Sequence, residues 1–128
     1  MVNKMSQKQI EFKILFRKPI YPLIVISKDK LMAAFNIKEL SKCCISAKPE
    51  KEGGVIKSID STGEEFWYSP EKYAISPGFA FKRWTKKQII ELYNNSNSVS
   101  EDTKYSEKSL SSKRLVRIIS DICYLLKS

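Results

Sequence analysis

The sequence predicts an α+β protein with a single domain over residues 1–128, in which an antiparallel sheet of four to five strands carries helices on one face. Three observations support this fold class. Short apolar runs separated by turn signals occupy the chain up to Pro77. Helix-capping patterns and helical spacing of apolar side chains dominate the remainder. The length of 128 residues suits one domain that buries about two-thirds of its unfolded surface.

Residues 1–8 are polar and are expected to be frayed, and the strands follow them. Strand patterns occur at 9–16, 23–27, 31–35, 55–60 and 65–68, with a further short one at 73–75. Gly63 lies in the connection between two of these runs and suits a turn that needs a positive φ. The dipeptide Pro77-Gly78 is a further turn signal.

The first expected helix runs over 37–44. Asn36 is a typical N-cap, because its side-chain oxygen can accept an early helical N–H, and Glu39 three residues later completes a variant of the capping box. The inward side of this helix is expected to consist of Ile37, Leu40 and Cys44.

Two more helices are expected towards the C-terminus. Thr85 and Gln88 form a capping box that opens a helix over 86–93. Residues 94–108 are rich in asparagine and serine and predict a mobile loop. The last helix, over 109–126, has the clearest pattern, since one face is apolar and basic residues occupy the others. Its apolar stripe consists of Leu115, Ile118, Ile119, Ile122 and Leu126.

The composition argues against an enzyme. No histidine is present, which removes the commonest general base and the commonest metal ligand. The three cysteines, Cys43, Cys44 and Cys123, lack the paired spacing of a zinc site and are expected to be buried as small hydrophobic residues. No apolar run approaches the ~20 residues of a membrane helix, and no signal peptide is recognisable. We therefore expect a cytoplasmic, non-enzymatic protein without cofactor, metal or membrane partner.

One stretch differs in charge from the rest of the chain, which has a net charge of +9. Residues 58–71 (SIDSTGEEFWYSPE), here called the acidic hairpin, contain four carboxylates, three adjacent aromatics and no lysine or arginine. A catalytic carboxylate needs burial to raise its pKa, and an exposed turn offers little. The hairpin is therefore predicted to be a contact surface for a protein partner. Its contact residues would be Asp60, Glu64, Glu65, Trp67, Tyr68 and Glu71.

The other interpretation of the acidic hairpin is purely structural. In a strand over 65–68, Phe66 and Tyr68 would face one side and Trp67 the other. One of these sides would then belong to the core. Both interpretations remain open from the sequence.

A basic patch supplies an alternative function. It consists of Lys82, Arg83, Lys86 and Lys87 around Trp84. Lysines can meet phosphates while the indole stacks on a base, which predicts a nucleic-acid-binding accessory protein. In the competing interpretation Trp84 packs against Ile89 as a hydrophobic staple and the cations are merely solvated.

The order of segments from about residue 20 to residue 70 carries a family resemblance. The segments are 21–27 (YPLIVIS), 32–35 (MAAF), 38–44 (KELSKCC) and 54–68 (GVIKSIDSTGEEFWY). This order resembles small immunity proteins of bacterial polymorphic toxin systems, including contact-dependent growth inhibition. The resemblance implies a cytoplasmic protein without enzymatic activity. Such a protein binds the toxic domain of a cognate effector, often a nuclease, and blocks its active site or an essential surface.

The net charge bears on what the resemblance implies. Contact residues differ within such families, so no partner-binding position is carried over to this chain. Nuclease toxins tend to be cationic, whereas this protein has a net charge of +9. Either the acidic hairpin overrides the global charge locally, or the toxin is itself acidic.

Overall fold

The computed structural model describes residues 12–28, 30–78, 82–96 and 113–127. The expectations for residues 1–8 and for most of the 94–108 loop lie outside this part of the chain. The elements, in chain order, are β1 (Lys13–Ile14), β2 (Leu23–Ile26), β3 (Leu31–Ala34), α2 (Ile37–Ser46), β4 (Ile56–Ile59), β5 (Glu65–Ser69), β6 (Ala74–Pro77), α3 (Lys86–Asn94) and α5 (Leu115–Lys127). The α+β class and the C-terminal helix are confirmed.

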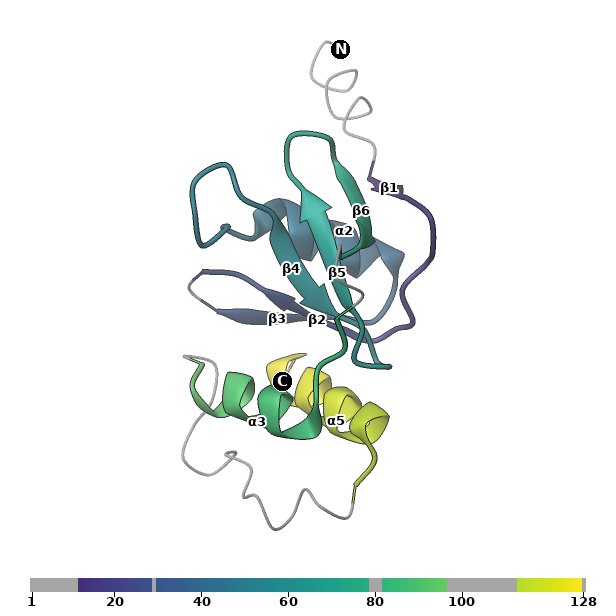
Figure 1. Ribbon diagram of the computed structural model, residues 1–128, viewed down its shortest axis with the longest axis vertical. Helices are drawn as coiled ribbons and strands as arrows, with labels where there is room; N and C mark the ends of the chain where they lie inside the picture. The colour runs from purple at the N-terminus through teal and green to yellow at the C-terminus, as the bar shows by residue number, and fades with distance from the viewer. Residues whose placement is uncertain (1–11, 29, 79–81, 97–112, 128) are drawn as a thin grey trace.

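The sheet has six strands in the order β1-β6-β5-β4-β2-β3, one more than the largest number expected (Figure 1). It is also mixed, because β1 runs parallel to β6 while the other neighbours are antiparallel. Backbone bonds from Lys13 to the carbonyl of Tyr73 and from Leu15 to that of Ile75, both 2.8 Å, hold β1 at the edge. The alternation over 9–16 predicted a strand but carried no information about the direction of its partner.

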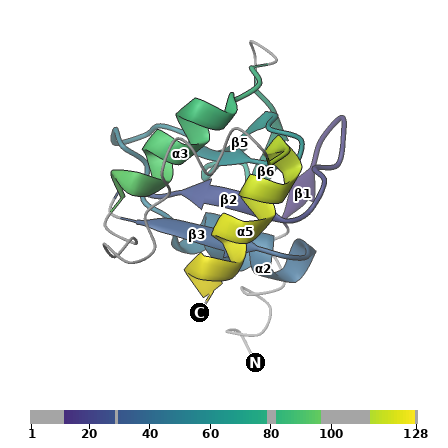
Figure 2. The same cartoon turned by 90° about the horizontal axis from the view of Figure 1, so that it is seen from below.

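The helices cover both faces of the sheet, so the prediction of helices on one face is wrong. Figures 1 and 2 show α2 on one side and α3 with α5 on the other. The apolar run of β2 explains this arrangement, since a strand that is apolar at every position is buried on both faces. Leu23 and Val25 pack in the core with α2, whereas Ile24 packs in the core with α3 and α5.

Each face of the sheet has its own core. The buried core towards α2 consists of Leu23, Val25, Ala34, Leu40, Cys44, Ile56, Phe66, Tyr68 and Ile75. The buried core towards α3 and α5 consists of Ile24, Leu31, Ile59, Ile89, Ile90, Tyr93, Ile118, Ile119, Ile122 and Cys123. Burial raises the thiol pKa of Cys44 and of Cys123 to about 12, so both thiols are protonated at neutral pH and unreactive.

The start of α2 follows the sequence closely, with two differences. The backbone N–H of Glu39 donates to Asn36 Oδ1 (2.9 Å), which confirms the N-cap. Glu39 Oε1, however, accepts from the N–H of Phe35 (2.8 Å) and not from the cap itself. Ile37 is 52% exposed, against expectation, because side chains on a helix lean towards its N-terminus and a first-turn residue can point past the sheet.

The capping box of α3 is confirmed in both halves. Thr85 Oγ1 accepts from the N–H of Gln88 (3.2 Å), and Gln88 Oε1 accepts from the N–H of Thr85 (3.0 Å). The last helix begins at Leu115, later than expected, because the carbonyl of Arg114 accepts the first helical N–H groups. Its apolar stripe packs on the sheet as predicted.

Candidate functional site

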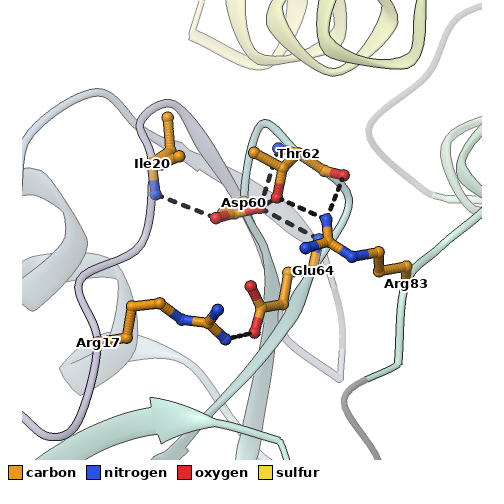
Figure 3. Close-up of polar contacts among 6 residues, drawn as sticks. All are labelled: Arg17, Ile20, Asp60, Thr62, Glu64 and Arg83. Atoms are coloured by element: carbon orange, nitrogen blue, oxygen red, sulfur yellow. Dashed lines mark hydrogen bonds and ion pairs between the residues drawn. The ribbon is translucent and has the colours of Figure 1, made fainter.

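The turn of the acidic hairpin is buried and is not exposed to solvent, although Glu71 at the end of the hairpin is exposed. Asp60, Glu64 and Glu65 are only 2%, 5% and 4% exposed. The prediction of exposure is wrong because two distant segments, residues 17–20 and 82–84, lie against the hairpin (Figure 3). The three carboxylates therefore connect parts of the chain that are far apart in sequence.

Asp60 holds both the turn between β4 and β5 and the segment that precedes β2. Its Oδ1 accepts from the backbone N–H of Thr62 (2.9 Å) and of Glu64 (3.1 Å), and from the hydroxyl of Thr62 (2.6 Å). Its Oδ2 accepts from the backbone N–H of Ile20 (3.1 Å). The N–H of Ser61 donates in turn to the carbonyl of Ile20 (3.0 Å). Both carboxylate oxygens of Asp60 thus accept hydrogen bonds from groups within the protein.

Glu64 forms an ion pair with Arg17, whose side chain remains half exposed. Its backbone forms an antiparallel bridge with Arg83. The Arg83 guanidinium donates to the carbonyl and to the hydroxyl of Thr62, at 3.3 and 3.2 Å (Figure 3). Arg17 therefore pairs with the buried carboxylate of Glu64, and Arg83 holds the neighbouring turn at Thr62.

Glu65 binds both tryptophans of the chain. Its Oε2 accepts from Trp67 Nε1 (2.6 Å) and its Oε1 from Trp84 Nε1 (3.0 Å). The backbone N–H of Glu65 donates to the carbonyl of Lys82 (3.0 Å). Glu65 thus fastens the segment before α3 to β5, next to the bridge between Glu64 and Arg83.

Replacing Glu65 with glutamine is expected to lower the free energy of unfolding by about 1–3 kcal/mol. The new amide NH2 would face one of the two indole N–H groups, and one buried donor would lose its acceptor. Urea unfolding followed by tryptophan fluorescence measures the loss. The matched control is Glu71→Gln at an exposed position of the same hairpin. Equal stability of the two variants would show that the indole contacts contribute nothing.

The aromatics of the hairpin follow the structural interpretation. Phe66 and Tyr68 are buried in the core towards α2, and the Tyr68 ring stacks on Phe12 at 5.4 Å between centroids. Trp67 is half-buried and faces the opposite side. Of the residues predicted to contact a partner, Glu71 alone is exposed.

The basic patch is brought against the hairpin. Lys82, Arg83 and Lys87 are exposed and Lys86 is half-buried. Trp84 packs against the core that contains Ile89, as the staple interpretation predicts, and the ammonium of Lys82 lies 4.7 Å from the centre of its ring. The indole is therefore occupied by contacts within the protein and is not presented for stacking on a base.

The sequence interpretation missed one exposed surface, residues 15–20, here called the 15–20 loop. Leu15, Phe16 and Ile20 are all exposed, and Phe16 is 95% exposed with φ +70°. The N–H of Arg17 donates to the carbonyl of Leu15 (2.8 Å), which closes a three-residue γ-turn around Phe16. Leu15 falls on the polar side of the strand alternation, and this mismatch is the signal that could have identified the loop.

A cavity of about 490 Å³ lies between the β2–β3 turn and α3. Charged side chains of both signs contribute to its lining, namely Lys28, Lys30, Lys82, Glu50 and Glu91. Within the described ranges no group of three or more Cys, Asp or Glu side chains could hold a metal ion. None of the helices in these ranges combines the length and apolar character needed to cross a membrane.

Comparison with models of protein families, with curated proteins and with solved structures finds no match for this chain.

Proposed function

We propose that this protein is a cytoplasmic, non-enzymatic inhibitor of the immunity type, which binds the toxic domain of a cognate bacterial effector and neutralises it by occlusion. The observation that carries the proposal is the 15–20 loop, which displays apolar side chains to solvent from a firmly fastened backbone. Exposed apolar side chains that gather in one place are typical of protein-interaction surfaces. The family resemblance supplies the kind of partner.

The chemistry of the acidic hairpin supports binding over catalysis. Asp60, Glu64 and Glu65 are the carboxylates that a hydrolytic mechanism could have used. Each is engaged by donors of the fold: Asp60 by backbone amides, Glu64 by Arg17 and Glu65 by two indoles. An interface of about 1,200–2,000 Å², with a few aromatic and charged anchors, would suffice for inhibition by occlusion.

A growth experiment tests the proposed function. Cells that express the C-terminal region encoded by the neighbouring upstream gene are expected to stop growing, and co-expression of this protein is expected to restore growth. An unrelated toxin, which this protein should not neutralise, is the specificity control. Toxicity that persists in the presence of this protein would contradict an immunity function.

The exposure of Lys82, Arg83 and Lys87 favours a second candidate, a nucleic-acid-binding accessory protein. Binding would rest on phosphate contacts, because Trp84 is engaged by Glu65 and by the core. It would therefore weaken steeply as salt rises. Titration of duplex DNA and of single-stranded RNA at about 50 mM salt tests this candidate, and negligible affinity for both would remove it.

A further inference from the structure

We propose that the 15–20 loop is the docking element of this protein, that Phe16 is its central anchor, and that it fits an apolar pocket bordered by carboxylates on an acidic protein partner. The inference deepens the proposed function and rests on it. The proposed docking surface lies outside the acidic hairpin and the basic patch.

The conformation of Phe16 is unfavourable unless it serves an external contact. A positive φ is uncommon for any residue except glycine and is a genuine outlier for a bulky one. Phe16 has φ +70° and is 95% exposed, so no packing within the fold offsets its backbone strain or the apolar surface that it leaves in water. Backbone strain of this kind clusters at sites that contact ligands.

The loop is held in place at three points. The N–H of Leu15 donates to the carbonyl of Ile75 (2.8 Å), and Arg17 pairs with Glu64. The N–H of Ile20 donates to the Asp60 carboxylate, and the carbonyl of Ile20 accepts from the N–H of Ser61. Figure 3 shows Arg17 and Ile20 reaching the hairpin from the same side. An anchor that is rigid before binding loses little conformational entropy when it docks, which raises affinity.

The charge around the loop points to an acidic partner. Arg17 and Lys18 are exposed within the loop and Arg83 is exposed beside it. Glu64 is buried and paired with Arg17, and the buried carboxylate of Asp60 accepts from backbone N–H groups and the Thr62 hydroxyl. The acidic hairpin therefore does not override the net charge of +9 at this surface. Complementary potential requires carboxylates on the facing surface.

A protein pocket agrees better with these observations than an anionic lipid surface does. Any conformation that exposes Leu15, Phe16 and Ile20 would satisfy a membrane interface. A turn of fixed and strained shape is an advantage only against a partner whose own shape is fixed. An aromatic ring that fills a pocket is the common form of an interface hot spot.

Calorimetric titration of the toxin domain from the growth experiment tests the inference. Phe16→Gly is expected to weaken binding at least about 30-fold, the factor that corresponds to a hot spot. Its melting temperature is expected to be no lower than that of the wild type, because glycine adopts φ +70° without strain. Tyr124→Ala, which truncates an aromatic on α5 that is 63% exposed, is the matched control and should change affinity less than about threefold.

The charge of the pocket rim is tested separately. Lys18→Glu is expected to weaken binding about tenfold at low salt and much less at high salt, because a rim charge acts through a screened potential. The control is Lys72→Glu, an exposed lysine between β5 and β6, which should leave affinity unchanged. Equal effects of the two substitutions would contradict the proposal that carboxylates border the partner's pocket.

The outcomes separate this inference from the proposed function. If the wild type binds and rescues but Phe16→Gly binds equally well, the docking inference falls and the proposed function stands. If the wild type neither binds nor rescues, both fall. Wild-type binding to vesicles of phosphatidylglycerol that disappears in Phe16→Gly would assign the loop to a membrane and overturn the protein pocket.

Discussion

Replacement of Asp60 with alanine is expected to lower the free energy of unfolding by about 3–5 kcal/mol, the cost typical of breaking a buried polar network. The substitution leaves the backbone N–H groups of Ile20, Thr62 and Glu64 without their acceptor, together with the hydroxyl of Thr62. Each unsatisfied buried donor costs about 1–3 kcal/mol, and partial access of water at this site reduces the sum. Urea unfolding measures the loss.

Two controls sharpen this experiment. Asp60→Asn keeps one oxygen for the turn but presents an NH2 group to the N–H of Ile20, so a smaller loss of about 1–2 kcal/mol is expected. Glu71→Ala removes an exposed carboxylate from the same hairpin and should stay within about 0.5 kcal/mol of the wild type. If Asp60→Ala were no more destabilising than Glu71→Ala, Asp60 would not hold the turn.

The second large effect is expected for Gly63→Ala, with a loss of about 2–4 kcal/mol. Gly63 has φ +88°, which an alanine adopts only under strain. Its new Cβ would also lie 2.6 Å from Leu115 Cδ2 and 3.1 Å from the carbonyl oxygen of Trp84. Leu115 can turn aside at some cost in packing, but the Trp84 carbonyl belongs to the backbone that faces β5 and can shift only with it.

Gly53→Ala measures the cost of backbone strain at a positive φ without a steric clash of the new Cβ. Gly53 has a similar φ of +80°, but a Cβ there would meet no atom within 4 Å. The expected loss is therefore the backbone term alone, about 1 kcal/mol. Thermal unfolding of both variants measures the difference, and equal losses would contradict the close approach of Leu115 to the turn.

Short-range features of the fold were predictable from the sequence. The N-cap at Asn36 and the capping box of Thr85 with Gln88 depend on contacts within one helical turn, and both form. The apolar stripe of α5 and the alternation of Phe66, Trp67 and Tyr68 are likewise periodic properties of a single element. Such patterns are visible in sequence because the groups that interact are neighbours along the chain.

The candidate site was predicted less well, because it depends on segments that meet only in the folded protein. Asp60 and Glu64 resemble an exposed acidic turn when residues 58–71 are considered alone. Arg17, Ile20 and Arg83 cover them in the structure, at separations of 19 to 47 residues. Nothing in the local sequence indicates that these segments converge, so burial, and with it the role of each carboxylate, could not be predicted.

The sequence by itself determined the α+β class, the order of the strands and helices, their caps, and the turn that needs Gly63, since each follows from local sterics and hydrophobic periodicity. Tertiary structure alone decided that helices cover both faces, that β1 runs parallel to β6, and that three carboxylates of the acidic hairpin, Asp60, Glu64 and Glu65, are buried. It also decided that Phe16 is displayed to solvent. These properties depend on long-range packing, in which a side chain's exposure is set by whichever distant segment comes to lie against it.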